Sequence, residues 1–121
     1  MKKHLSIIIF LLALPLFFSF TQNEKPVSLA AAYQHCFPIG TAINPAVDFA
    51  TKKRKQFIAF QYNSVTAENQ MKPRQIHPKE GKWNWEPADN IVQFAKENNM
   101  KVRGHALVWF QNVPDWMIRE N

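Results

Sequence analysis

Short strand-like segments alternate with helical segments along this chain, and this order constrains the fold more than any other feature. Strands are predicted at 37–43, 63–66 and 101–109, where apolar and β-branched residues gather in short runs. A helix is predicted between each strand and the next. Alternation of this kind favours a parallel sheet whose strands are joined by helical crossovers. The predicted fold class is therefore α/β.

The two crossover helices have distinct start and stop signals. Asp48 is the predicted N-cap of the first helix, whose apolar residues recur at helical spacing over 49–60. The Glu-Pro pair at 86–87 opens the second helix, because proline in the first turn loses no hydrogen bond. The Asn-Asn pair at 98–99 ends it, since asparagine tolerates a left-handed turn. A further helix is predicted to begin at 114–116.

Three parallel strands leave both edges of a sheet open, and an open edge is a liability. The last residues, 118–121, extend the final predicted helix by about a turn and contain neither a glycine cap nor a closing proline. These features are typical of about three of the eight βα units of a (β/α)8 TIM barrel. We therefore expect an incomplete barrel, and not a finished domain.

Residues 1–21 have the layout of a secretory signal peptide. Two lysines near the N-terminus precede an uncharged, apolar run at 5–20. The mature chain is predicted to begin near Gln22 and to be secreted, either to the periplasm or outside the cell, without a stable membrane association. The competing interpretation is a membrane anchor, which needs about 20 apolar residues. This run is shorter and contains Pro15.

The segment 22–36 is interpreted as a lead-in to the first strand, in which 29–33 forms either a short helix or an irregular stretch. Cys36 is the single cysteine of the chain, so an internal disulfide is impossible and burial alone must stabilise the fold. Its neighbours are typical of a strand entering a core. We therefore predict a buried, unreactive thiol.

The positive charge of the chain is modest. The formal net charge is +6; removing 1–21 takes away two lysines, so 15 − 2 = 13 basic residues face 9 acidic ones and the charge becomes +4. The most basic run, 52–55, lies within the first helical segment. Nucleic-acid-binding surfaces interleave such residues with aromatic residues or glycines on one face. A solvated helix face is predicted here, and not a nucleic-acid partner.

Polar side chains gather where the second and third strands are predicted to end. They are Glu68, Asn69 and Lys72 after the second strand, and His105 and Trp109 near the end of the third, with Gln111 and Asn112 in the following loop. Parallel barrels place their active sites at this end of the strands. Hydroxyl groups of a sugar would bond to the polar groups, while an indole would cover the apolar face of a pyranose ring. The shared location favours a sugar site, although each residue alone also suits a helix cap, a solvated surface or a core position.

Other kinds of site are not supported. No zinc-like spacing, glycine-rich phosphate loop or serine elbow is present, and neither a metal nor an organic cofactor is expected. Trp83 and Trp85 flank the start of a helix and not the end of a strand. Their predicted role is packing.

Several motifs together resemble glycoside hydrolase family 10. The segment 66–72, TAENQMK, resembles T-x-E-N-x-M-K, and 85–89 resembles the aromatic-x-x-A-D start of a helix. The segment 103–109, RGHALVW, followed by 114–116, resembles R-G-H-x-L-V-W…P-x-W, and 37–40 is similar to the family's first strand. These motifs occur in the family's order and cover nearly all of the predicted mature chain.

The resemblance implies an endo-1,4-β-xylanase that cleaves xylan, or a related β-1,4-linked polysaccharide, with retention through two carboxylates about 5 Å apart. The family's catalytic glutamates follow the fourth and seventh strands. Residues 37–121 are therefore expected to form the N-terminal part of a catalytic domain, truncated before both glutamates, with no catalytic residue and no activity of its own. The alternative is a non-catalytic truncated product or a carbohydrate-binding remnant.

The resemblance also implies roles for the five candidate residues. Glu68, Asn69 and Lys72 would bind substrate on the non-reducing side of the cleavage point, while His105 and Trp109 would surround the sugar that is distorted during the reaction. Glu68 would not be the acid/base. One position departs from the family, because Phe110 stands where a histidine is usual and cannot make that residue's hydrogen bond.

Overall fold

The computed structural model describes residues 25–118. The predicted signal peptide, 1–21, and the last residues, 119–121, lie outside the described residues. Within the described part, no helix combines the length and the apolar character that crossing a membrane requires.

The centre of the fold is a three-stranded parallel sheet. It contains β1 (Gly40–Ile43), β2 (Ser64–Ala67) and β3 (Lys101–Arg103), in the spatial order β1-β2-β3. Because each crossover moves to the next strand in one direction, the sheet has the sequential order of a barrel, and not the reversal of a doubly wound sheet. The predicted α/β class and parallel sheet are confirmed.

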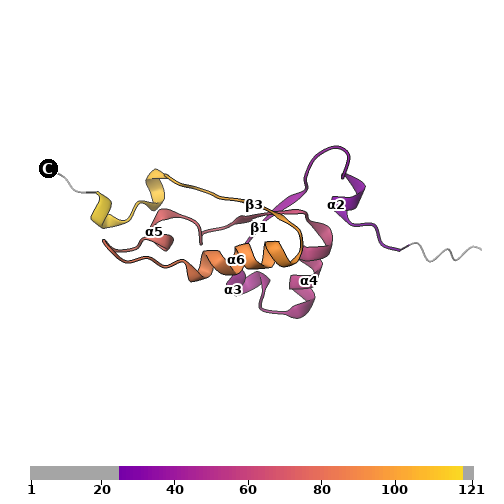
Figure 1. Cartoon of the computed structure of the whole chain (residues 1–121), viewed down its shortest axis with the longest axis horizontal. Helices are drawn as coiled ribbons and strands as arrows, with labels where there is room; N and C mark the ends of the chain where they lie inside the picture. Colours follow the sequence, from indigo (N-terminus) through magenta and orange to yellow (C-terminus); the bar gives the residue numbers. More distant parts are fainter. Residues whose placement is uncertain (1–24, 119–121) are drawn as a thin grey trace, which may run out of the picture.

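Two longer helices cross between the strands. α4 (Lys52–Gln61) connects β1 to β2, and α6 (Glu86–Glu97) connects β2 to β3. Both helices lie on the same side of the sheet (Figure 1), as right-handed crossovers in one direction require. The shorter elements are α2 (Leu29–Ala32), α3 (Pro45–Asp48) and α5 (Pro73–Ile76), with 3-10 turns η1 (Phe110–Asn112) and η2 (Asp115–Met117).

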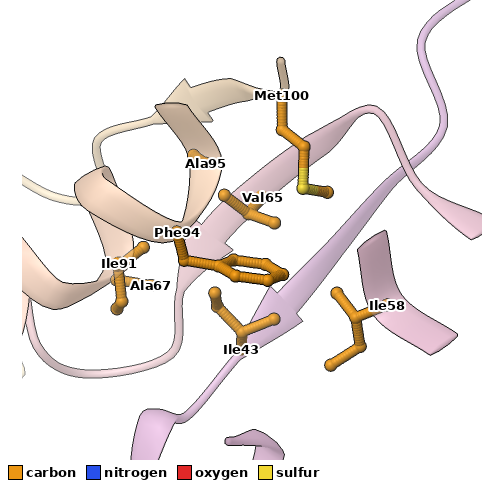
Figure 2. Close-up of a cluster of buried hydrophobic side chains, with 8 residues drawn as sticks. All are labelled: Ile43, Ile58, Val65, Ala67, Ile91, Phe94, Ala95 and Met100. Carbon is orange, nitrogen blue, oxygen red and sulfur yellow. The ribbon is translucent and has the colours of Figure 1, made fainter. Parts of the chain in front are cut away.

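The hydrophobic core fills the space between the sheet and these helices. Figure 2 shows the ring of Phe94 from α6 lying close to Ile43 and Val65 of the sheet. The remaining members of the cluster are Ile58, Ala67, Ile91, Ala95 and Met100. Alternate residues of β2 are buried, which is the period-2 pattern of a strand with one covered face. The core therefore lies on one face of the sheet only.

The predicted N-cap of α4 was wrong. Asp48 is the last residue of α3, and its carboxylate accepts hydrogen bonds from the backbone N–H of Asn44 (2.7 Å) and from Nε of Arg54 (2.9 Å). The cap of α4 is Thr51, whose hydroxyl accepts from the N–H of Arg54 at 3.2 Å. An extra helical turn, begun by Asn44 and Pro45, moves the cap three residues along the chain.

Two predicted strands are shorter in the structure, and one consequence concerns Cys36. β1 begins at Gly40, so Cys36 precedes it and is exposed; the prediction of a buried thiol was wrong. β3 ends at Arg103, six residues before Trp109. It pairs with β2 alone, and β2 turns into its own loop after Ala67. Without a strand to pair with, the apolar run that follows Arg103 leaves the sheet.

Other boundaries agree with the predictions. Pro87 lies in the first turn of α6, and Asn99, just beyond the helix, has a φ of 54° in the left-handed region. The segment 29–33 contains a short helix, α2, capped by the Ser28 hydroxyl. The helix predicted at 114–116 is the short turn η2 within the described residues.

The packing of α6 on the sheet generates a stability prediction. Phe94→Ala should lower the free energy of unfolding by about 3–5 kcal/mol, because it removes a large buried ring from the centre of the core. Val92→Ala on the exposed face of the same helix should cost less than about 1 kcal/mol. Urea denaturation followed by circular dichroism measures both. Equal effects would contradict this account of the core.

Candidate sugar-binding site

The carboxyl ends of β2 and β3 lie level with each other, because Thr66 pairs with Arg103 in the parallel register. The loops that leave the two strands therefore begin side by side. In Figure 1 the yellow C-terminal segment runs next to α5, at the end of the sheet away from α2. The five predicted site residues all lie in these two loops.

Three of the five residues form one connected group. The Lys72 ammonium donates a hydrogen bond to the side-chain oxygen of Asn69 at 2.8 Å. The same ammonium lies over the Trp109 indole, 4.5 Å from the ring centroid. A cation at this distance from an indole face is attracted by the ring quadrupole. Lys72 thus joins the loop after β2 to the loop after β3.

His105 lies at the edge of this group. Its ring centroid is 6.3 Å from that of Trp109, with the ring planes tilted by 58°. The side chain is half-buried, and within the described residues it has no hydrogen-bond partner. The imidazole can therefore still donate to or accept from a ligand.

Glu68 occupies the strand end but does not join the group through its side chain. Its backbone N–H donates to the carbonyl of Ile43 at 2.9 Å, which ties the loop to the end of β1. The carboxylate is exposed, and among residues 25–118 it has no hydrogen-bond or ion-pair partner. An ionised carboxylate of this kind is an acceptor open to ligand hydroxyl groups.

A hydrogen-bond relay extends the group to the end of β1. The side-chain oxygen of Gln70 accepts from the backbone N–H of Asn69 at 3.1 Å, and its amide nitrogen donates to the side chain of Asn44 at 3.2 Å. The loops after all three strands are therefore linked. The sequence motif contains Gln70, but no periodicity or spacing indicates its contact with Asn44, which lies 26 residues earlier.

Two residues beyond the five, Asn112 and Arg74, have notable hydrogen-bonding properties in these loops. The side-chain oxygen of Asn112 is buried and has no hydrogen-bond partner among the described residues. Such an atom is costly unless a ligand or a neighbour satisfies it. Arg74 donates hydrogen bonds from the loop after β2 to Val113 and Asp115 in the loop after β3. Asn112 belongs to the polar loop predicted from the sequence, whereas only the structure reveals the contacts of Arg74.

The aromatic residues Trp83 and Trp85 pack against each other and not in the core. Their rings stack at 5.2 Å and 4°, and His77 stacks on Trp83 at 3.8 Å. Both tryptophans remain about half exposed. Phe110, the residue that departs from the family motif, is also exposed. Trp83 and Trp85 therefore form an exposed aromatic stack outside the core cluster.

The chemistry of the strand-end group suits recognition of a neutral, hydroxyl-rich ligand. It combines an ammonium, an amide, an imidazole and a carboxylate with one indole ring. No group of three or more acidic, histidine or cysteine side chains within 25–118 is arranged to hold a metal ion. Glycoside hydrolysis by a pair of carboxylates needs two of them about 5–10 Å apart. Of the five predicted residues, Glu68 alone carries one.

Comparison with known proteins decides the family. Residues 28–121 match Glycosyl hydrolase family 10. The chain belongs to glycosyl hydrolase family 10. The predicted resemblance is thereby confirmed. The family is one of glycoside hydrolases.

Several similar proteins are named xylanases, and one is named an exoglucanase, XynX of Acetivibrio thermocellus. Endo-1,4-beta-xylanase A of Halalkalibacterium halodurans is 44% identical over 100 residues, which is 78% of this chain and 25% of the relative. The crystal structure of xylanase B from Clostridium stercorarium F9 superposes with a TM-score of 0.71 at 46% identity, covering 75% of this chain and 26% of that chain. A mutant protein solved in complex with xylotriose superposes with a TM-score of 0.73 at 42% identity, covering 79% and 29%.

These coverages show how much of each relative the chain matches. The chain spans about a quarter of the length of the first of these relatives. Family 10 xylanases are TIM barrels, and the described sheet corresponds to their N-terminal part, so the predicted incomplete barrel is confirmed. The roles of Glu68, Asn69, Lys72, His105 and Trp109 in this family 10 chain stay predictions.

The Lys72–Trp109 contact is testable without any ligand. An indole shields protons that lie over its face, so the ε-methylene protons of Lys72 should resonate upfield of an exposed lysine. Trp109→Leu should return them to the ordinary position. Phe57→Leu, which removes an exposed aromatic ring from α4, is the control and should leave them unchanged. NMR of the labelled chain measures the shift; an ordinary Lys72 shift in the unmodified chain would contradict the geometry.

Proposed function

We propose that this chain is the substrate-binding N-terminal part of a retaining endo-1,4-β-xylanase. The observation that supports the proposal is the contact of Lys72 with Asn69 and Trp109 across two strand-end loops, within a chain whose family 10 relatives are named xylanases. Because a related structure was solved with xylotriose, we propose a xylan chain as the ligand. No residue of this chain is assigned as acid/base or nucleophile.

The side-chain geometry suggests how a xylose unit binds. Lys72 uses one of its three N–H donors on Asn69, which leaves donors for ligand hydroxyl groups. Because the Asn69 oxygen accepts from the ammonium, its NH2 group is oriented to donate as well. The ammonium covers one face of the Trp109 indole, so the pyranose packs on the opposite face. The exposed Glu68 carboxylate supplies a further hydrogen-bond acceptor for the sugar.

The contribution of these residues to catalysis is orientation. Groups that hold a substrate in a reactive geometry lower the barrier, and they lower it further where their bonds tighten in the transition state. The chemical step of a retaining glycosidase requires two carboxyl groups about 5–5.5 Å apart. We propose that these carboxyl groups lie in sequence outside the 121 residues, and that the isolated chain binds xylan without hydrolysing it.

Secretion forms part of the proposal. The apolar N-terminal run favours export of the chain by a signal peptide. The predicted mature chain begins near Gln22, and analysis of the N-terminus of the exported protein would test that position.

Binding and hydrolysis can be measured separately. The chain should bind xylotriose, and Lys72→Met should weaken binding by about tenfold or more, because hydrogen bonds from a charged group contribute about 1.5–3 kcal/mol. Trp109→Ala should also weaken it, whereas Phe57→Ala, at an exposed ring of α4, should not. Isothermal titration calorimetry measures the affinities, and a reducing-sugar assay on xylan should record no product. Binding that survives Lys72→Met and Trp109→Ala would contradict the proposed site.

The alternative, a non-catalytic carbohydrate-binding remnant, makes the same predictions for binding. The coding DNA separates the two. A frame that continues past codon 121, with glutamates after a fourth and a seventh strand, supports the xylanase. A stop codon directly after Asn121 leaves a sugar-binding product without a catalyst.

A further inference from the structure

We propose that Arg74 is a positioning residue of the sugar site, which fastens the loop after β3 to the loop after β2 and so holds Trp109 beside Lys72. The inference rests on the proposed role of Trp109 in sugar binding. Within the described residues, the Arg74 side chain bonds to Val113 and Asp115 and to neither Lys72 nor Trp109. Its effect on a ligand is therefore indirect.

The Arg74 guanidinium makes two contacts with the second loop through one nitrogen. Nη2 donates to the carbonyl oxygen of Val113 at 2.7 Å and to the carboxylate of Asp115 at 2.9 Å. These partners lie 39 and 41 residues along the chain from Arg74. Since β3 pairs with β2 only as far as Arg103, the contacts form a second junction between the two βα units.

A neighbouring junction reinforces the first. The indole N–H of Trp116 donates to the backbone carbonyl of His77 at 3.0 Å. The His77 ring lies between two tryptophans, stacked on Trp83 at 3.8 Å and edge-on to Trp116 at 4.5 Å. Pro114, between the two anchored residues, is fully buried. Together Arg74 and Trp116 hold 113–116 against α5 and the residues that follow it; we call these two contacts the loop clamp.

In the sequence, the loop clamp and Trp109 are separated only by the 3-10 turn η1. The backbone N–H of Asn112 donates to the carbonyl of Trp109 at 3.0 Å, which closes η1, the single turn between Trp109 and Val113. On the other side of Trp109 the chain is held much less. Leu107 and Val108 are 98% and 86% exposed and lie outside any strand. The position of Trp109 therefore depends on the clamp more than on β3.

The two Arg74 contacts differ in strength. Asp115 has 87% of its side chain exposed and Arg74 44%, so solvent screens this ion pair and its removal changes little. The bond to the Val113 carbonyl is short and has a charged donor, which makes it the stronger constraint. Asp115→Ala should weaken xylotriose binding by less than about threefold, whereas Arg74→Ala should weaken it by about tenfold.

The test measures loop position and ligand binding in the same set of variants. The variants are Arg74→Ala, Arg74→Lys and Asp115→Ala. The matched control is Arg54→Ala, since Arg54 also pairs with an aspartate, Asp48, at 2.9 Å but links α3 to α4. The first measurement is the upfield shift of the Lys72 ε-methylene protons without ligand. The second is the dissociation constant for xylotriose, with the Val65 methyl resonances reporting that the core is intact.

We expect Arg74→Ala to abolish most of the Lys72 shift and to weaken binding, while Arg54→Ala changes neither. Arg74→Lys keeps a charged donor and should retain more of the shift than Arg74→Ala. If Arg74→Ala does not fold, Arg74→Lys and Trp116→Phe take its place in the comparison with Arg54→Ala. Trp116→Phe removes the indole N–H of the loop clamp. A Lys72 shift that is unchanged in every folded clamp variant overturns the proposal.

The same data distinguish this inference from the proposed function. If the shift is lost in Arg74→Ala but the unmodified chain does not bind xylotriose, the clamp holds Trp109 as inferred and the sugar-binding role is wrong. If the chain binds xylotriose through Lys72 and Trp109 while Arg74→Ala leaves shift and affinity unchanged, the proposed function stands and the positioning role is overturned.

Discussion

The packing of α6 against β2 is the constraint on which the rest of the structure depends. β2 pairs along both of its edges, and its buried residues Val65 and Ala67 face the helix. Phe94 fills the space above them and contacts Phe49 of the preceding crossover, with ring centroids 4.7 Å apart. Because apolar burial and strand pairing act through the same four residues, β2 determines where the flanking strands end.

The proposed sugar-binding edge follows from that arrangement but is stabilised differently. The core brings the carboxyl ends of β2 and β3 to one level, while the loops beyond them are joined by single polar contacts centred on Lys72 and Arg74. Contacts of this kind contribute little individually in water. They decide how closely Trp109 approaches Lys72, so the affinity of the site is set by the loops and its location by the sheet.

Sequence patterns predicted the helices, which have apolar periodicity, and the helix ends that depend on the type of a single residue. Apolar periodicity located α4 and α6, and the left-handed preference of asparagine located the end at Asn99. The motif around Lys72 placed it next to Asn69. The cap of α4 was missed because Asp48 is as good a cap by type as Thr51. The contacts of Arg74 were missed because they join exposed loops 39–41 residues apart, where no periodicity exists.

The central claim is that one ligand meets both loops at Lys72 and Trp109. Intermolecular nuclear Overhauser effects between xylotriose and the labelled chain test it most directly. The account predicts contacts from sugar ring protons to the Trp109 indole, with further contacts at Lys72 and Asn69 on the same xylose unit. Sugar contacts confined to the Trp83–Trp85 pair, or spread evenly over the exposed apolar residues, would contradict it.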